Sequence, residues 1–524
     1  TILEPEVYFQ GTFKDDTGLT PAQKAYEDET FVSGTNVDYY TYTYHSKEDN
    51  RDIIVAYFID EEATWKKSQN YTTYKLNIES IAYSPGYGWV GMKEQSIVRR
   101  TTLFMYQVFF ENTLEILPGP NFDLHGLVHT NEDLYLNANN NLRIYTDSIT
   151  SAGQIFRGRL DNNSASGNVY ISSGDAKGNL VKMNIGTDSK NSNWRNLATQ
   201  NWKGTLRDKS LGATRLEAPK LESFEPGGYY DQNAGLKIEV LAKGRSTSNV
   251  VYKITKDGVT KSYSASQLNG ALKEATMYDR REYGTSKQIK ITEVDIQKLA
   301  STLGYPENGI IYMTRDDAVP DNDNNPYVPS SSRVVSGFKL QSGSKLPAAS
   351  TIVSNLPTYI KGDFNLHTST DPNLDTWKPC AVIADAVTLL SNSWNNSYSN
   401  KTQTASNTTF NTVLITGNVP TKVGQYSGGL ENFPRFLENW DGKTATINGG
   451  FIQLFRSKYA TGLWSGDYYS APTRNWGAEK RFSDLTSLPP GYADLFPSTS
   501  LGVAYSNWSL ISKEESMLGD DFND

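Results

Sequence analysis

Two histidines, His125 and His129, stand four residues apart in the segment LHGLVHT and could together bind a metal ion. On a helix this spacing would place both imidazoles on one face, as in many zinc sites. Gly126 and the neighbouring Val and Thr residues instead favour a strand, along which the two side chains would be about 13 Å apart. We therefore predict a structural pair of histidines that shares no metal ion.

Cys380 is the single cysteine of the chain, so no internal disulfide can form. A thiol can act as a catalytic nucleophile, but the apolar run Cys380–Ala384 is typical of a buried, inert cysteine. Neither His45 nor His367 has a Cys or Ser motif nearby, and the sequence contains no nucleophile elbow and no phosphate-binding glycine-rich loop. The sequence predicts no catalytic residue, no cofactor-binding residue and no enzyme activity.

The acidic run after Arg315 offers hard oxygen ligands of the kind that Ca²⁺ prefers. Its candidate ligands are Asp321, Asp323 and Asn325. Pro326 stands where a calcium loop needs glycine, so a solvated loop without an ion is the alternative. Polysaccharide lyases built as β-solenoids use clustered Asp residues with an Arg, so this run is also the main support for an enzyme hypothesis.

Aromatic residues in segments rich in Gly, Asn and Ser are the candidate binding residues. Exposed rings beside amides can stack on sugar rings or anchor a partner protein. The alternative is that the rings fill the core or cover the edges of the fold. The predicted binding surface consists of Tyr426, Trp464, Tyr469 and Trp476.

Composition limits the class of protein. The chain has 524 residues, 37% hydrophobic residues, 32 Tyr and a net charge of −8. Abundant Tyr, Thr, Asn and Gly suit strands and turns. The acidic balance leaves no Lys/Arg stripe for phosphates, so we predict no nucleic-acid partner. No apolar run reaches the roughly 18 residues that a membrane-spanning helix needs.

The periodicity predicts a mainly β fold. Residues 1–113 alternate polar and apolar positions over long runs, as in an antiparallel sheet. From residue 114 the strands become short, with frequent turns, which favours a β-helix or solenoid; a β-sandwich is the alternative. Glycines at 126, 153, 362 and 417 are expected to mark corners.

These patterns predict five regions along the chain. We expect the central insertion to pack outside the core, and the short amphipathic helix 430–440 to lie against the solenoid. The regions are an antiparallel β domain at 1–113, the first part of the solenoid at 114–217, an α+β insertion at 218–309, the second part of the solenoid at 310–480 and a loosely attached C-terminal tail at 481–524.

Several blocks in the same order resemble a bacterial family. Residues 356–476, 115–159, 277–299 and 308–318 are similar to PilX-type accessory proteins of type IV pilus systems. This resemblance implies a pilin-like N-terminal sheet, an extracellular location on the bacterial cell surface and other pilus or pilin subunits as partners. The family has no established catalytic activity. Its members carry a leader and a hydrophobic helix upstream of the matched region.

The sequence therefore leads to one main hypothesis and two alternatives. The main hypothesis is a non-enzymatic component of a type IV pilus or related surface appendage, acting in structure or adhesion. A weaker analogy to the cellulose-binding tapirins suggests a polysaccharide-binding adhesin. A β-helix carbohydrate-active enzyme is the third possibility.

Overall fold

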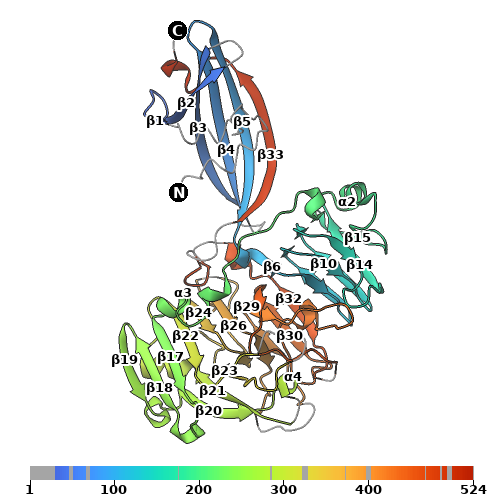
Figure 1. Ribbon diagram of the computed structural model, residues 1–524, viewed down its shortest axis with the longest axis vertical. Coiled ribbons are helices and arrows are strands. Elements are labelled where there is room, and N and C mark those ends of the chain that lie inside the picture. The colour runs from blue at the N-terminus through green and yellow to red at the C-terminus, as the bar shows by residue number, and fades with distance from the viewer. Residues whose placement is uncertain are drawn as a thin grey trace. The chain divides into compact units, whose positions relative to one another are not determined.

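The chain folds into two compact units (Figure 1). Unit 1 comprises Thr1–Thr101 and Ser500–Asp524, and unit 2 comprises Thr102–Thr499. The computed structural model is mainly β, as predicted. It describes residues 30–46, 51–66, 71–174, 176–283, 286–321, 329–371, 373–396, 403–466, 468–483, 487–492 and 499–522.

Unit 1 is one six-stranded sheet in the order β1-β2-β3-β4-β5-β33. The strands β1 to β5 pair with their neighbours in antiparallel register. A tight turn joins β4 to β5, with Gly86 and Gly88 at φ 75° and 119°, values that favour glycine. The bounds are β1 (Thr30–Val32), β2 (Tyr39–Ser46), β3 (Arg51–Lys66), β4 (Tyr71–Ser84), β5 (Gly88–Thr101) and β33 (Thr499–Ile511).

The C-terminal segment is part of this sheet, so the prediction of a loosely attached tail at 481–524 is wrong for the described residues from 499 onward. β33 lies beside β5 at the edge of the sheet. Beyond it, Leu518 is fully buried, and the ring of Phe522 packs 5.6 Å from that of Tyr39. The apolar residues among the terminal acidic ones decide this docking, because their burial removes apolar surface from water. Unit 2 is thus inserted between two neighbouring strands of unit 1.

Unit 2 is a three-faced parallel β-helix, which excludes the sandwich alternative because sandwich strands pair antiparallel. The first face is a 12-stranded sheet in the order β16-β12-β9-β6-β31-β29-β26-β24-β22-β17-β18-β19. Its strands are β6 (Tyr106–Phe110), β9 (Leu127–Thr130), β12 (Ile149–Ser151), β16 (Leu206–Arg207), β17 (Leu236–Leu241), β18 (Val251–Lys256), β19 (Val259–Tyr263), β22 (Ile310–Arg315), β24 (Ser350–Ser354), β26 (Cys380–Ala384), β29 (Val413–Asn418) and β31 (Phe451–Arg456).

The second face is a seven-stranded sheet in the order β15-β14-β11-β8-β32-β30-β28. Its strands pair in parallel except for β15, which pairs antiparallel with β14. The strands are β8 (Phe122–His125), β11 (Asn141–Tyr145), β14 (Asn168–Ser173), β15 (Ala176–Lys182), β28 (Thr408–Phe410), β30 (Thr444–Asn448) and β32 (Thr473–Gly477).

The third face is divided into two separate sheets. One holds β13-β10-β7 and the other holds β20-β21-β23-β25-β27. The strands are β7 (Leu114–Ile116), β10 (Leu134–Leu136), β13 (Ile155–Arg157), β20 (Leu272–Met277), β21 (Ile289–Asp295), β23 (Ser336–Gln341), β25 (Thr358–Lys361) and β27 (Val387–Leu390).

The coils are stacked in an unusual order, visible on the first face (Figure 1). The chain starts in the middle with β6 and winds outward through β9 and β12 to β16. It then crosses to the opposite end, begins again at β17 and winds back through β22 and β26. The last coil, with β31, pairs in parallel with β6. Residues 114–217 and 310–480 therefore contribute strands to the same sheets.

Apolar residues in register build the core. Leu114, Leu134 and Ile155 align across the third face, and each is fully buried. Between the second and first faces the chain turns at Gly126, whose φ of 131° suits glycine. A side chain there would place its Cβ 2.7 Å from the Cβ of Gln107. Gly153, between β12 and β13, and Gly362, after β25, also lie in bends as predicted, whereas Gly417 lies within β29 and is not a corner.

The predicted α+β insertion at 218–309 does not pack outside the core. β17 pairs in parallel with β22, and β21 pairs in parallel with β23, so both strands continue the β-helix. Ile238 and Val294 belong to the main hydrophobic core. The alternation of apolar residues along these strands explains the difference, because one face of each strand must be buried. The helices near this end are α3 (Tyr229–Gln232), α4 (Arg280–Tyr283) and α5 (Ile296–Leu303), while α2 (Trp194–Trp202) covers the other end.

The predicted helix 430–440 is also wrong. Only a single 3₁₀ turn, Leu430–Asn432, is helical. After it the backbone N–H of Arg435 donates to the carbonyl of Val387 at 2.9 Å, and the carbonyl of Arg435 accepts from Leu389 at 2.8 Å. Pro434 has no N–H to give to a helix, and the extended segment instead bonds to β27.

Asparagine side chains are stacked along two corners. The side chain of Asn141 donates to that of Asn121 at 2.9 Å and accepts from that of Asn168 at 3.0 Å. In the other half, Asn448 donates to the side chain of Asn411 at 2.8 Å. Each ladder links the side-chain amides of successive coils, which range from the exposed Asn121 to the buried Asn411.

Candidate binding site at the seam of the β-helix

The third face is interrupted where the two halves of the β-helix meet. The two coils next to β7 have loops on this face, at 419–443 between β29 and β30 and at 457–472 between β31 and β32. We call this interruption the seam. The loop 419–443 is tied to the residue after β7, since Glu431 accepts a hydrogen bond from the N–H of Leu117 at 3.1 Å. Loops held by a rigid scaffold are frequent sites of binding.

Two of the predicted aromatic residues meet at the seam. The rings of Tyr426 and Trp464 pack edge to face with centroids 5.1 Å apart. The guanidinium carbon of Arg159 lies 4.6 Å from the centroid of the Tyr426 ring, and Arg159 pairs with Asp161 at 2.8 Å. All four residues are partly exposed. We call Arg159, Asp161, Tyr426 and Trp464 the seam site.

Carboxylates support the seam site from beneath. The hydroxyl of Tyr426 donates to Glu431 at 2.7 Å and accepts from the N–H of Gly429 at 2.8 Å. Glu115, on β7, accepts from the N–H of Leu160 at 3.2 Å. Burial, with a smaller contribution from the charge of Glu431, raises the pKa of Glu115 to about 7. The Tyr426 ring is therefore fixed in one orientation by buried polar groups.

The other two predicted aromatic residues have internal roles. The hydroxyl of Tyr469 donates to the side chain of Asn432, and its ring lies 5.6 Å from that of Phe436. Trp476 is on β32, is 2% exposed and packs against Phe451 with ring centroids 5.0 Å apart. The expectation of an exposed loop ring is therefore wrong for Trp476, which belongs to the core.

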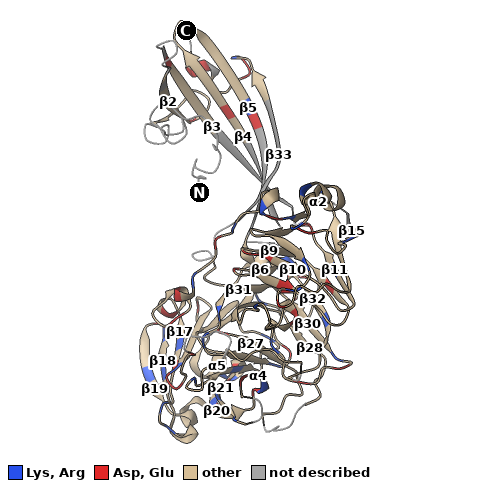
Figure 2. Cartoon of the chain, turned by 45° about the vertical axis from the view of Figure 1, so that its right-hand side comes forward, with Lys and Arg blue, Asp and Glu red and all other residues tan. Residues whose placement is uncertain are grey.

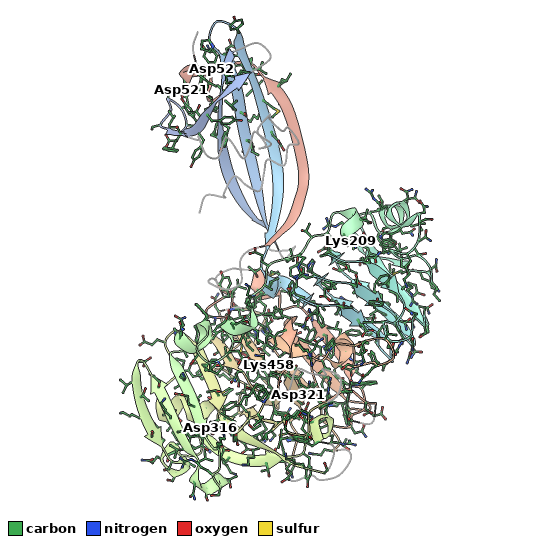
Figure 3. The ribbon with its side chains drawn as sticks, in the orientation of Figure 1. Asp52, Lys209, Asp316, Asp321, Lys458 and Asp521 are labelled. Atoms are coloured by element: carbon green, nitrogen blue, oxygen red, sulfur yellow. The ribbon has the colours of Figure 1, made fainter. Side chains whose placement is uncertain are left out.

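Of the three predicted calcium ligands, only Asp321 is among the residues that the structure describes. Asp321 is buried and accepts from the N–H of Ser330 at 2.8 Å and from the hydroxyl of Thr461 at 2.5 Å. Its own N–H donates to the carbonyl of Lys458 at 2.7 Å, and both residues lie within the β-helix (Figure 3). Asp323 and Asn325 lie outside the described residues. Within the described part of the chain, no group of three or more His, Cys, Asp or Glu residues could hold a metal ion.

His125 and His129 lie on different strands, β8 and β9, on either side of the Gly126 corner, and not on one strand as predicted. His129 is buried between Thr150 at 2.7 Å and Asn131 at 2.8 Å, and burial lowers its pKa to about 4. Cys380 is fully buried on β26, and burial raises the pKa of its thiol to about 12.

Arg315, the basic partner in the enzyme hypothesis, is held in buried ion pairs. Its side chain contacts Asp317 at 3.0 Å and Glu274 at 3.0 Å. A second network on α4 joins Glu282 to Arg333 and Arg435, each at 2.5 Å. Over the rest of the described chain, Lys and Arg residues are interspersed with Asp and Glu residues (Figure 2).

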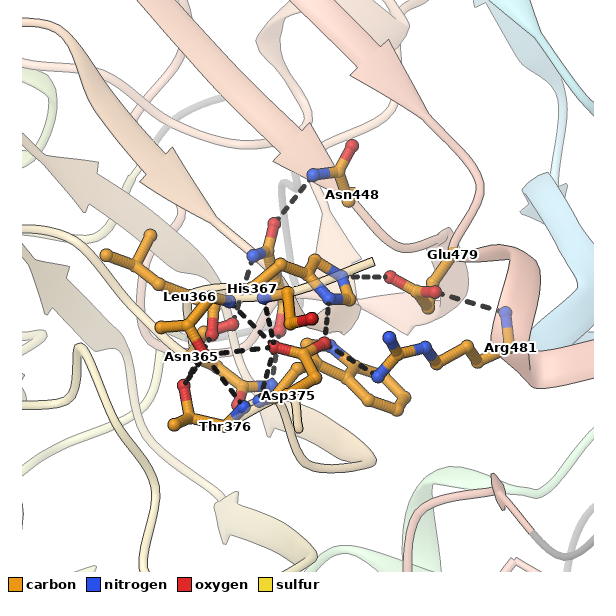
Figure 4. Close-up of polar contacts among 12 residues, drawn as sticks. Asn365, Leu366, His367, Asp375, Thr376, Asn448, Glu479 and Arg481 are labelled. Atoms are coloured by element: carbon orange, nitrogen blue, oxygen red, sulfur yellow. Dashed lines mark hydrogen bonds and ion pairs between the residues drawn. The ribbon is translucent and has the colours of Figure 1, made fainter. Parts of the chain in front are cut away.

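A second polar cluster was not predicted (Figure 4). His367 contacts Asp375 through Nδ1 at 2.6 Å and Glu479 through Nε2 at 2.8 Å. Arg481 pairs with Asp375 at 2.7 Å, and the imidazole stacks on Trp377 at 5.5 Å. The hydrogen bond to Glu479 raises the pKa of His367, although partial burial works in the opposite direction. With a carboxylate at each nitrogen, the imidazolium links the loop after β25 to the segment after β32 and is not left to bind a ligand.

Among the described residues, no helix is long and apolar enough to cross a membrane. No protein-family model matches the chain. No curated protein matches it either. One solved structure is similar at a low level, the competence-associated pilin ComZ from Thermus thermophilus, at 11% identity and a TM-score of 0.29, over 93% of this chain and 88% of that chain. This TM-score is too low to carry an argument about fold or function.

Proposed function

We propose that the chain is a non-enzymatic component of a bacterial surface appendage of the type IV pilus kind, and that its β-helix binds polysaccharide at the seam site. The observation that supports binding is the edge-to-face pair of Tyr426 and Trp464 beside the Arg159–Asp161 ion pair. Partly exposed rings stack on sugar faces, and the ion pair bonds to hydroxyl groups at their rims. The extracellular setting and the pilus subunits as partners rest on the resemblance of several sequence blocks to PilX-type proteins, which no family model reproduces.

The test is binding of the purified chain to a panel of soluble and insoluble glycans. Replacing Trp464 with Ala should weaken binding to the preferred glycan by about 5- to 150-fold, since a well-packed aromatic contact contributes about 1–3 kcal/mol. Val423→Ala is the matched control, because Val423 is 73% exposed on the same loop as Tyr426. Equal binding by the Trp464→Ala variant, with its fold intact, would contradict a role for the seam site.

A β-helix carbohydrate-active enzyme is the second candidate. It is favoured by the two carboxyl groups of Glu115 and Glu431, one of which has a pKa raised to about 7. Both side chains are buried, at 5% and 4% exposure, whereas a catalytic acid has to reach the glycosidic oxygen. Release of soluble sugar from any glycan in the panel, abolished by Glu115→Gln, would favour this candidate over the adhesin.

A further inference from the structure

A small cavity lies behind the seam loops, with room for about one water-sized group. Residues 417–419 and 427–429, from the end of β29 and the loop that follows it, form about half of its wall. The cavity is lined by Phe110, Arg281, Gly417, Asn418, Val419, Ser427, Gly428, Gly429, Asn432, Phe433 and Arg435.

Arg281 brings a buried positive charge to this cavity without a carboxylate hydrogen-bonded to its guanidinium. The residue is 8% exposed. Its guanidinium donates to the carbonyl of Gly462 at 2.9 Å and to those of Asn432 and Ser427 at the long distance of 3.4 Å. Burial, and next the charge of Arg435, lower its pKa to about 9. A buried cation whose hydrogen bonds go only to neutral acceptors is costly.

The nearest carboxylates are already occupied. Glu282 directs its oxygens to Arg333 and Arg435. Asp279 accepts from the hydroxyl of Tyr359 at 2.5 Å and from the N–H groups of Arg281 and Glu282. Neither is hydrogen-bonded to the Arg281 guanidinium.

The hydroxyl of Ser427 is a second donor at the cavity. Ser427 is 2% exposed, and its Oγ has no hydrogen-bond partner among the described residues. A buried hydroxyl without a partner is uncommon in folded proteins, and the Ser427 hydroxyl can donate to a group in the cavity. The Arg281 guanidinium and the Ser427 hydroxyl, beside a space of this size, make a donor set for an anion.

We infer that this cavity binds a single halide-sized anion, chloride under ordinary conditions, between Arg281 and Ser427. The anion would add to the partial compensation that the charges of Glu282 and Asp279 give Arg281, and it would hold residues 417–429 against α4. This site is independent of glycan binding at the seam site, because it uses different residues on the inner side of the loops.

The direct test is a crystal of the full chain grown with sodium bromide in place of sodium chloride. An anomalous-difference peak within hydrogen-bond reach of the Arg281 guanidinium and Ser427 Oγ is expected. A cavity filled by water alone, with no anomalous peak, overturns the inference.

A solution test compares thermal unfolding in chloride and in gluconate at equal ionic strength. Chloride should raise the Tm of the wild type by roughly 2 °C, as expected for a ligand that binds only the folded state of a large unit. Arg281→Met should abolish this difference, and Ser427→Ala should reduce it, while Arg195→Met, an exposed arginine on α2, should keep it. If Arg281→Met does not fold, the test rests on whether Ser427→Ala reduces the Tm difference between chloride and gluconate. A chloride effect of unchanged size in the cavity variants, or none in the wild type, contradicts the inference.

Discussion

Phe451 in β31 pairs in parallel register with Val108 in β6, and both side chains are fully buried. The last coil of the β-helix is thereby stacked directly on the first. On the second face, Gly477 pairs with His125 at the same junction. The two halves of unit 2 therefore have a common core, and neither completes its sheets without the other.

Truncating Phe451 should test this junction. Phe451→Ala removes contacts with Phe433 and Trp476 and should lower the free energy of unfolding by about 3–5 kcal/mol, the usual cost of deleting a buried phenylalanine ring. Urea denaturation measures the change. Leu374→Ala, at a residue that is 72% exposed, should change stability by less than about 0.5 kcal/mol. Similar small effects for both variants would show that the halves are not coupled through this contact.

Glu115 should make stability depend on pH. Its folded-state pKa of about 7 lies above the ordinary value of 4.5, so its contribution is most favourable below pH 4.5 and is lost as the pH rises through 7. Glu115→Gln cannot ionise and should be more stable than the wild type at pH 8, by on the order of 3 kcal/mol, and similar to it at pH 4.5. Chemical denaturation at the two pH values measures this. If the variant and the wild type differed in free energy of unfolding by the same amount at both pH values, the raised pKa of Glu115 would be contradicted.

His367 should also stabilise the fold more at low pH than at high pH, but through an ion pair and not through burial. Its pKa is raised by the carboxylate of Glu479, so the stabilising contact is present below pH 6.5 and is lost as the pH rises through the folded-state value. His367→Gln should therefore lower the Tm more at pH 5.5 than at pH 9. Thr370→Ala, an exposed, non-titrating change in the same loop, serves as the control. A larger loss at pH 9 would reverse the expected sign.

The asparagine ladder should contribute measurably to stability. Asn411 donates to the carbonyl of Asn365 at 3.0 Å and accepts from Asn448 at 2.8 Å, and it is 1% exposed. Asn411→Ala leaves these partners unsatisfied and should cost about 1–3 kcal/mol. The exposed Asn475 provides the matched Asn475→Ala variant, which should have little effect. Unfolding in urea distinguishes the two.

Local patterns predicted the local features of this fold. The short strands and frequent turns from residue 114 predicted a β-helix, which the structure forms, and Gly126 was predicted as a corner. The pairing of β17 with β22, and of β33 with β5, joins segments that are distant in the sequence. Such parallel or long-range pairing leaves no local signal, so the end coil was interpreted as an insertion and the edge strand as a tail.

At the candidate site, too, the sequence predicted local features but not contacts between distant segments. Aromatic residues in loops rich in glycine and asparagine identified Tyr426 and Trp464, which the structure brings together. The same criterion selected Trp476, whose strand was not recognised because its alternation is weak. His367 and Glu479 are 112 residues apart, and nothing in either segment indicates the other.

The order of the coils also bears on how this protein can change during evolution. The chain enters unit 2 beside β6, and near its exit Phe482 packs 6.1 Å from Phe104, so entry and exit lie together at the central coils. Both ends of the β-helix, covered by α2 and by the β18–β19 hairpin, are remote from these connections in the order of coils. Duplication or loss of a coil at either end therefore changes the length of the β-helix without disturbing the points where unit 2 is connected to the rest of the chain.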